Sequence, residues 1–255
     1  MQKITLTFAS VTLLSIAAIA QQPPITPPQE KFPMKPEMTE FWEPQVRVVT
    51  PGTGTAAPSD AIVLFDGKDA SKWESAKDSG PVKWTIKDGA LTIVKGMGDI
   101  RTKDKFGDFQ LHVEWRSPEK VESQGQGRGN SGIYLQERYE LQVLDSYQNR
   151  SYSNGQAGSI YKQSPPLVNA MRKPGEWQVY DVIYTAPRFK EDGSLFTPAR
   201  VTVMHNGVLI HNNFEIKGAT EYIGPPSYKA HGEAPLRLQE HSNPVSFRNI
   251  WIRKL

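Results

Sequence analysis

Side chains that can do acid–base or sugar-binding chemistry recur at alternate positions of three strand-like segments. They are Gln110, His112, Glu114 and Arg116; Glu140 and Gln142; and Arg237, Gln239 and His241. An ordinary solvated strand face would carry more lysine, whereas planar amide, carboxylate and guanidinium groups match neighbouring sugar hydroxyls. The pattern therefore favours a carbohydrate-binding face, with Glu and His available for proton transfer.

The segment from Glu140 to Asp145 has two acids five residues apart, with Gln142 between them. Laminarinase-type glycosidases carry a similar Glu-x-Asp-x-x-Glu strand, in which a bulge brings the two outer carboxylates together as nucleophile and acid/base. Here the middle acid is replaced by Gln142 and the last residue is the shorter Asp145. A pair of catalytic carboxylates does not follow from this spacing alone.

Several other chemistries lack their residues. The chain has no cysteine, which excludes thiol nucleophiles, zinc–thiolate sites and disulfides. The formal net charge is +3, so no broad field favours nucleic acid. Nucleophile-elbow, Walker, zinc-protease and dinucleotide-binding motifs are absent from the sequence. We predict no cofactor and no metal at the site, and leave open a structural calcium held by loop oxygens.

The sequence predicts that the elements that position these residues are β-strands. From residue 60 onward, short apolar segments alternate with turn signals, and no helical period is sustained. The expected strands span 61–65, 84–87, 90–94, 108–116, 131–136, 139–144, 158–161, 177–184, 200–205, 208–212, 235–240 and 247–253. Asp88-Gly89 and Asn206-Gly207 predict tight hairpin turns. We therefore expect an all-β fold, an antiparallel two-sheet jelly-roll sandwich.

The start of the chain differs from the rest. Residues 1–20 combine a basic start, an apolar run and an Ala-x-Ala ending, which predicts a secretory signal peptide rather than a membrane span. Residues 21–58 hold nine of the 20 prolines and predict an extended N-terminal segment. Residues 59–255 form the single predicted domain. The expected location is outside the cytoplasm, either periplasmic or secreted.

Ordered blocks of the sequence resemble a known family. The opening blocks are Leu64-Phe65-Asp66-Gly67-Lys68-Asp69 with Trp73, and Gly107-Asp108-Phe109 through Glu114-Trp115-Arg116. The central blocks are Gly129-Asn130-Ser131-Gly132-Ile133-Tyr134-Leu135, Tyr139 through Asp145, Gly158-Ser159-Ile160-Tyr161, Pro165 through Ala170, and Pro174-Gly175-Glu176-Trp177. The closing blocks are Leu236 through His241 and Phe247 through Ile252. Over residues 60–255 the chain resembles the 3-keto-disaccharide hydrolase domain family.

The resemblance implies a concanavalin-like jelly roll that is usually exported and acts on glycosides already oxidised at C3 by a separate oxidoreductase. A C3 ketone acidifies the C2 hydrogen, so a base can remove it and form an enediolate. The C1 substituent then leaves by elimination, and water adds to give the 3-keto sugar. Such a route needs a base, oxyanion donors and an acid, and it needs no close pair of carboxylates.

Under this resemblance we assign roles to ten residues. Glu140 is the first candidate for base or acid and Glu114 the second; Arg116 and Arg237 would stabilise the enediolate, and His241 would shuttle protons. The remaining candidates would bind substrate; they are Asn130, Gln142, Tyr161, Gln239 and His112. Each also has a structural alternative, such as a cross-strand ion-pair network that includes Glu114 and Arg116, a turn cap at Asn130, or a core position for Tyr161.

Two other functions stay open at this point. The same fold serves lectin-like modules that bind carbohydrate without cleaving it. An ordinary retaining glycosidase would place two carboxyl groups about 5 Å apart. The ionisable side chains on the expected ligand face favour an enzyme.

Overall fold

A computed structural model describes residues 33–255 of the chain. These residues fall into a short N-terminal unit that ends at Arg47 and a larger unit, Val48–Leu255. The N-terminal unit contains one 3-10 turn, η1 (Pro36–Thr39). The expected signal peptide, residues 1–20, and the first part of the proline-rich segment lie outside the described residues. Within the described part of the chain, no helix has the length and apolar character to cross a bilayer.

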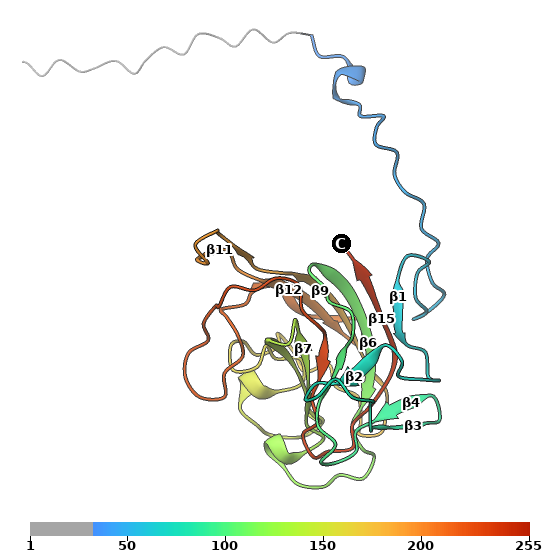
Figure 1. The fold of residues 1–255 in the computed structure, drawn as a ribbon, viewed down its shortest axis with the longest axis vertical. Coiled ribbons are helices and arrows are strands. Elements are labelled where there is room, and N and C mark those ends of the chain that lie inside the picture. Colours follow the sequence, from blue (N-terminus) through green and yellow to red (C-terminus); the bar gives the residue numbers. More distant parts are fainter. Residues whose placement is uncertain (1–32) are drawn as a thin grey trace, which may run out of the picture. The chain divides into compact units, whose positions relative to one another are not determined.

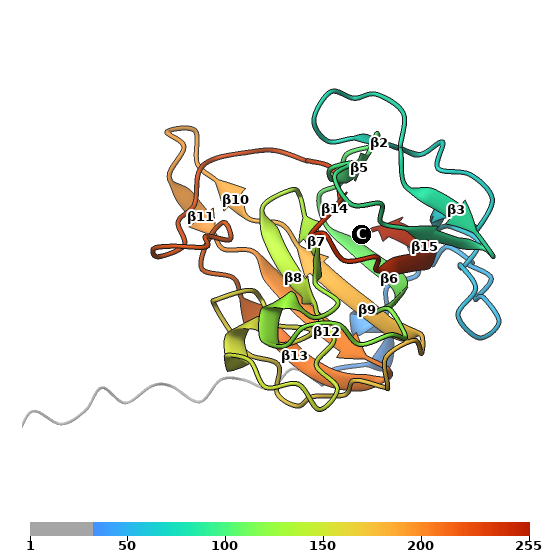
Figure 2. The same ribbon diagram turned by 90° about the horizontal axis from the view of Figure 1, so that it is seen from below.

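The larger unit contains two main antiparallel sheets, which pack face to face (Figures 1 and 2). The eight-stranded sheet has the order β13 (Val208–Glu215), β12 (Arg200–His205), β9 (Gln178–Thr185), β6 (Phe109–Arg116), β15 (Ser246–Lys254), β4 (Ala90–Thr92) and β3 (Thr85–Lys87), with β1 (Ile62–Phe65) also paired to β15. The five-stranded sheet has the order β2 (Trp73–Ser75), β5 (Ile100–Thr102), β14 (Arg237–Leu238), β7 (Ser131–Leu135) and β8 (Tyr139–Val143). The predicted antiparallel jelly-roll sandwich is confirmed.

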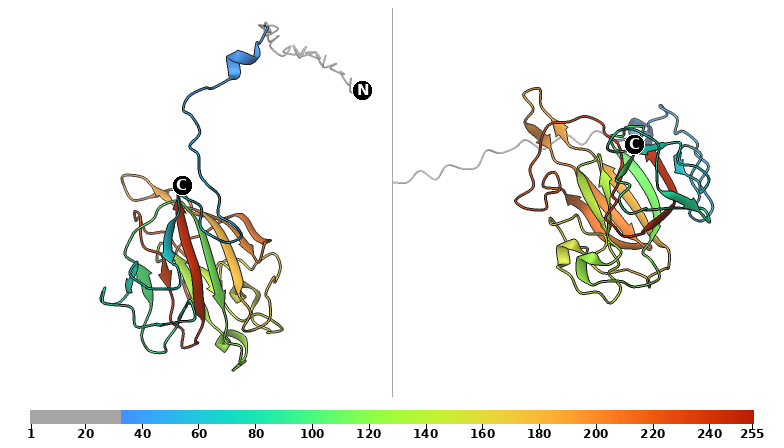
Figure 3. Two further views of the ribbon diagram at one scale, coloured as in Figure 1. Left: turned by 90° about the vertical axis from the view of Figure 1, so that its right-hand side faces the viewer. Right: turned by 60° about the horizontal axis from the view of Figure 1, so that its bottom comes forward.

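Three smaller elements decorate the two sheets. A two-stranded hairpin joins β10 (Arg188–Phe189) to β11 (Leu195–Thr197). Two single 3-10 turns, η2 (Gly125–Gly127) and η3 (Ser153–Gly155), lie in the loops that precede β7 and follow β8. The long central strands β15 and β6 run side by side in the larger sheet (Figure 3).

The core lies between the two sheets because each strand turns its apolar side chains toward the other sheet. On β6 the alternate residues Phe109, Leu111, Val113 and Trp115 are all buried, as the sequence pattern predicts. Tyr184 of β9 joins the layers, since its ring centroid lies 4.9 Å from that of Phe109 and 6.1 Å from that of Tyr139 on β8. The polar alternates of the two sheets therefore face outward in opposite directions.

The two predicted tight turns are present. Asp88 and Gly89 have φ angles of 51° and 71°, and Asn206 and Gly207 have φ angles of 53° and 80°. Positive φ at both central residues is what a two-residue hairpin of type I′ needs, and asparagine, aspartate and glycine tolerate it best. These turns connect β3 to β4 and β12 to β13.

The structure corrects the sequence-based strand assignment in three respects. The expected strand over 158–161 is absent, and Ile160 makes only isolated bridges to Leu141 and Ser164. The strands β2, β5, β10 and β11 were not predicted, because two or three residues show no periodicity. Trp177, the first residue of the expected strand over 177–184, lies just before β9, is half-buried and packs against the guanidinium groups of Arg116 and Arg248.

Candidate active site

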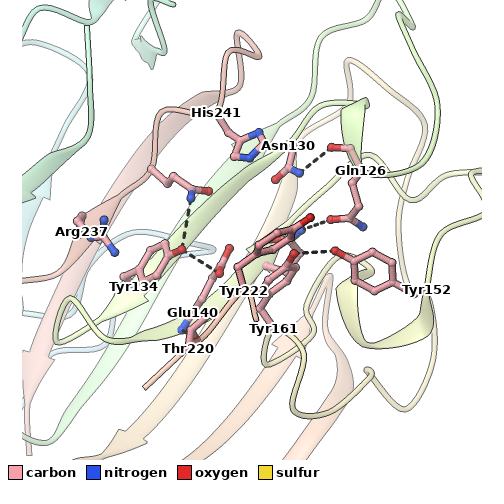
Figure 4. Close-up of a pocket in the computed structure, with 12 residues that line it drawn as sticks. Gln126, Asn130, Tyr134, Glu140, Tyr152, Tyr161, Thr220, Tyr222, Arg237 and His241 are labelled. Carbon is pink, nitrogen blue, oxygen red and sulfur yellow. Dashed lines mark hydrogen bonds between the residues drawn. The ribbon is translucent and has the colours of Figure 1, made fainter. Parts of the chain in front are cut away.

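A cavity of about 600 Å³ opens on the outer face of the five-stranded sheet. Its volume lies in the range of small-molecule binding pockets. The lining residues are Gln126, Asn130, Tyr134, Glu140, Gln142, Tyr152, Tyr161, Thr220, Tyr222, Arg237, Gln239 and His241 (Figure 4). The sheet supplies the floor and four loops supply the walls.

Strand register places three of the lining side chains in one row across the sheet. Arg237 on β14 is paired with Tyr134 on β7, and Tyr134 is paired with Glu140 on β8. In the next row Gly132 is paired with Gln142. A methyl group at Gly132 would lie 2.6 Å from Glu140 Oε1, so the absent side chain leaves the room that the carboxyl group occupies.

Glu140 is the chemical centre of this row. It is only 4% exposed, and its Oε2 accepts a hydrogen bond of 2.9 Å from the Tyr134 hydroxyl. Burial raises the pKa of the Glu140 carboxyl to about 7, although the Tyr134 hydrogen bond and the Arg237 charge act in the opposite direction. A carboxyl group that titrates near neutral pH suits proton abstraction and return.

Tyr134 makes contacts through both its ring face and its hydroxyl group. The Arg237 guanidinium lies 3.8 Å from the ring centroid and forms an ion pair of 2.6 Å with Asp99. The Gln239 amide donates to the Tyr134 hydroxyl at 3.3 Å. Burial and the nearby Glu140 raise the pKa of Tyr134 well above its usual value, so the phenol keeps its proton and remains a donor to Glu140.

The Gln142 amide lies between two acceptors. With its nitrogen toward Glu140 it donates to Oε1 at 2.9 Å and to the Ser131 carbonyl at 3.1 Å. Turned over, it donates to Gln126 Oε1 at 3.0 Å. An ionised Glu140 favours the first orientation, because a carboxylate only accepts hydrogen bonds.

The opening of the cavity carries an amide, an imidazole and three phenols. Asn130 donates to the Gln126 carbonyl at 2.7 Å, which orients its side chain. His241 is exposed beside it. On the other side of Glu140, the hydroxyl groups of Tyr152 and Tyr161 are 2.6 Å apart, and Tyr222 lies near them.

The structure brings seven of the ten sequence-predicted residues into this cavity. They are Glu140, His241, Asn130, Gln142, Tyr161, Arg237 and Gln239. The other three, His112, Glu114 and Arg116, belong to β6 in the other sheet. Because the polar faces of the two sheets point in opposite directions, the expectation of one shared ligand face was wrong for these three residues.

Glu114 is instead a buried carboxylate within a partly exposed hydrogen-bond cluster on the outer face of the larger sheet. Its carboxylate accepts from Arg248 at 2.6 Å, from Asn249 at 2.9 Å and from Thr55 at 2.9 Å. Burial alone would raise the pKa of Glu114, but the three hydrogen bonds together hold it below its usual value. An ionised, fully paired carboxylate is a structural arrangement.

The two other predicted residues on β6, His112 and Arg116, also contact side chains of the larger sheet and its flanking loop. His112 Nδ1 lies 2.6 Å from Asp181 Oδ1, and the His112 ring stacks on Trp251 with centroids 5.2 Å apart. The Arg116 guanidinium lies 4.7 Å from the centroid of Trp177. The cross-strand ion pair of Glu114 with Arg248 agrees with the structural alternative, whereas Arg116 packs on Trp177 instead.

Asp145 does not form a carboxylate pair with Glu140. Its Oδ2 accepts from Arg128 at 2.6 Å and its Oδ1 from the backbone of Tyr147 at 3.1 Å. Among the described residues that line the cavity, Glu140 alone carries a carboxyl group. Over residues 33–255, no group of three or more His, Cys, Asp or Glu side chains is arranged to hold a metal ion.

Five lining residues were not predicted from the sequence: Gln126, Tyr134, Tyr152, Thr220 and Tyr222. Tyr134 could have been found, since it alternates with the apolar residues Ile133 and Leu135 in an expected strand. Residues in irregular loops have no such signal, and only the folded chain shows that they meet.

Comparison with known proteins identifies relatives that share the sequence and the fold of this chain. A crystal structure of a proposed glycosyl hydrolase from Parabacteroides distasonis is 59% identical, with a TM-score of 0.84 over 87% of this chain and 97% of that one. A second such structure from the same species is 25% identical, with a TM-score of 0.56 over 77% and 94% of the two chains. The 3-keto-disaccharide hydrolase of Bacteroides thetaiotaomicron is 27% identical over 78% of this chain and 80% of its own length.

A family model extends the agreement to most of the chain. The model for the 3-keto-alpha-glucoside-1,2-lyase-like domain matches residues 60–253, which include both sheets except the last residue of β15, and every residue that lines the cavity. The chain belongs to the 3-keto-alpha-glucoside-1,2-lyase-like domain family.

Proposed function

We propose that this protein is a glycosidase-type hydrolase that cleaves 3-keto glycosides by elimination and water addition. The observation that carries the proposal is Glu140, a single buried carboxyl group with a pKa of about 7 in a sugar-sized cavity. The family and the name of the Bacteroides thetaiotaomicron relative support the same substrate class.

In the proposed reaction, ionised Glu140 takes the C2 hydrogen of a ring whose C3 is a ketone. The electron pair of the broken C2–H bond forms a C2–C3 double bond, and the electrons of the C3 carbonyl move to its oxygen, which becomes an oxyanion. The Gln239 amide and the positive charge of Arg237 are the groups available to stabilise it.

The oxyanion then collapses back to the ketone, a C1–C2 double bond forms, and the C1–O bond breaks. The departing oxygen takes a proton, for which His241 is the proposed carrier. Water adds at C1, and Glu140 returns its proton to C2. The products are a free 3-keto sugar and the released alcohol, so the sum is a hydrolysis with no net redox change.

The two other functions fit the site less well. A retaining glycosidase uses two carboxyl groups about 5 Å apart, whereas Asp145 is bound by Arg128 and Glu140 is the sole carboxyl group of the described lining. A binding module has no use for a carboxyl group buried at a free-energy cost, and a raised pKa at the floor of a pocket is typical of catalysis.

The test is to incubate the purified protein with a 3-keto disaccharide and, separately, with the same disaccharide unoxidised. We expect cleavage of the ketone alone, and a loss of about 10²–10⁴-fold in kcat/KM for Glu140→Gln. Glu122→Gln is the matched control, because Glu122 is exposed, is paired with Lys120 and lies outside the cavity lining. Cleavage of neither sugar would leave the binding module as the better account, and cleavage of the unoxidised sugar would favour the retaining glycosidase.

The proposal has two consequences for the setting of the enzyme. Since the substrate must already carry a ketone at C3, an oxidoreductase acting on glycosides must supply it. We also propose that the protein works outside the cytoplasm, on the basis of the signal-peptide pattern in residues 1–20.

A further inference from the structure

Glu140 separates two chemically different halves of the cavity. On one side, toward the middle of the sheet, lie Tyr134 and Arg237 in the same cross-strand row. On the other side, beyond β8, the last strand of the sheet, lie Tyr152, Tyr161 and Tyr222, which we call the tyrosine rim (Figure 4). The first half presents the Arg237 guanidinium and hydrogen-bond donors, and the second half is built mainly from aromatic rings.

The tyrosine rim is fixed directly to the backbone of Glu140. The Tyr161 amide donates to the Glu140 carbonyl at 3.1 Å, and the Glu140 amide donates to the Thr220 hydroxyl at 2.9 Å. Tyr222 follows Thr220 by two residues. The tyrosine rim therefore lies directly beside Glu140, the proposed base.

The rim is also ordered before any ligand arrives. The hydroxyl groups of Tyr152 and Tyr161 are hydrogen-bonded, and the Lys162 ammonium lies 4.4 Å from the Tyr222 ring centroid and donates to the Tyr222 carbonyl at 2.8 Å. Tyr222 nonetheless remains 70% exposed and Tyr152 41% exposed. Exposed aromatic rings held in place form a binding surface at little entropic cost.

The geometry of the substrate decides what meets each half, because C2 lies between C1 and C3. With C2 at Glu140, the C3 ketone and the C1 substituent must lie on opposite sides of the carboxyl group. The oxyanion that develops at C3 requires donors and positive charge, which the Arg237 half supplies. In the reverse placement it would face the rim, where burial and the Tyr152 hydrogen bond raise the pKa of Tyr161 and make it a weaker proton donor.

We infer that the tyrosine rim is the subsite for the leaving group, and that it selects leaving groups with a ring over small alkyl groups. This inference rests on the proposed function. A pyranose ring and an aryl ring both present a flat face of C–H or π character that stacks on tyrosine. The rim thus sets substrate specificity at C1, while the Arg237 half receives the oxidised ring.

The test compares three 3-keto glucosides of the same anomeric configuration, whose leaving groups are methanol, glucose and phenol. For Tyr222→Ala, we expect kcat/KM to fall about five- to tenfold for the glucose and phenol substrates, and no more than about twofold for the methyl substrate. Tyr152→Ala should show the same selectivity. Phe196→Ala is the control, because Phe196 is 68% exposed on β11, outside the cavity lining.

The outcomes separate this inference from the proposed function. A selective loss with one ring-bearing substrate supports the inference and identifies the ring. An equal loss with all three substrates, or no loss with any, overturns it. If the wild-type protein cleaves none of them, the proposed function fails, and calorimetric binding of the intact glucosides decides the subsite: Tyr222→Ala must weaken the ring-bearing compounds selectively, or the inference falls as well.

Discussion

At the scale of the residue, the behaviour of Glu140 is set by opposing influences on one carboxyl group. Burial raises its pKa to about 7, while the hydrogen bond from Tyr134 and the charge of Arg237 lower it. The balance keeps a useful fraction of the group ionised at neutral pH. It also makes the pKa of Glu140 sensitive to any change in its two neighbours.

This balance predicts the pH dependence of catalysis. The base must be ionised to act, so kcat/KM for a 3-keto glycoside should rise with pH through a midpoint near 7 and fall about tenfold per pH unit well below it. Tyr134→Phe removes the hydrogen bond that lowers the pKa and should move the midpoint to higher pH. Rate profiles of both proteins measure this.

Tyr147→Phe is the control for that substitution, since Tyr147 lies outside the cavity lining. It should leave the midpoint unchanged. A wild-type midpoint near pH 4.5, the ordinary value for a glutamate, would contradict the assignment of Glu140 as the base. A downward shift in Tyr134→Phe would contradict the role of its hydroxyl.

At the scale of the element, β7 approaches the Glu140 carboxyl closely because it carries glycine at position 132. A methyl group there would lie 2.6 Å from Glu140 Oε1 and 2.9 Å from Tyr134 Cε2. Gly132→Ala should therefore displace the carboxyl group and reduce kcat/KM about 100-fold, because catalysis is sensitive to misplacement of about 1 Å. The unfolding midpoint should change little, since the colliding atoms belong to side chains.

The matched control for this substitution is Gly232→Ala. A methyl group at Gly232 would meet no atom within 4 Å, and the residue is outside the cavity lining. Steady-state rates and thermal unfolding of the two variants compare the same chemical change in a crowded and an open place. Full activity in Gly132→Ala would show that the exact position of the carboxyl group is unimportant.

The strands also show how far the sequence could predict the site. The alternation of polar and apolar residues along 139–144 and 235–240 correctly predicted that Glu140, Gln142 and Arg237 face away from the core. The same kind of alternation predicted that Glu114 on β6 also faces away from the core. Periodicity does not reveal, however, which sheet a strand joins. Two polar faces that look alike in sequence therefore lie on opposite sides of the sandwich.

Loop residues were beyond prediction for a different reason. Tyr152 and Tyr222 lie in irregular segments and meet at the cavity only because both loops return to the edge of β8. Contacts between residues that are 70 positions apart leave no local pattern in the chain. Tyr134, in contrast, obeyed the strand period and was overlooked.

At the scale of the whole molecule, the outer face of the larger sheet serves stability. The segment that precedes β1 crosses this face, where the Thr55 hydroxyl donates to Glu114 and the Thr55 carbonyl accepts from Asn249 and Trp251. The Glu114 carboxylate thus links the start of the domain to its last strand. The outer face of the larger sheet thus stabilises the fold, whereas the outer face of the five-stranded sheet carries the candidate active site.

This division predicts opposite effects for the two buried glutamates. Glu114→Ala leaves the donors on Arg248, Asn249 and Thr55 without their acceptor and should lower the free energy of unfolding by about 2 kcal/mol. The kcat/KM of the folded variant should stay within about twofold of the wild type. Denaturant unfolding and rates at low temperature test the two parts, and a large loss of activity without a loss of stability would return Glu114 to the catalytic candidates.

The central claim is that bond cleavage begins when Glu140 removes the C2 hydrogen. The most direct measurement is the NMR spectrum of the 3-keto sugar released from a 3-keto disaccharide in D₂O, with the free product incubated alone to correct for spontaneous exchange. We predict deuterium at C2, because the proton on Glu140 can exchange with solvent before water adds at C1, and we predict that Glu140→Gln forms this product at least about 100-fold more slowly. A product that retains only protium at C2, or a Glu140→Gln variant as active as the wild type, would contradict the account.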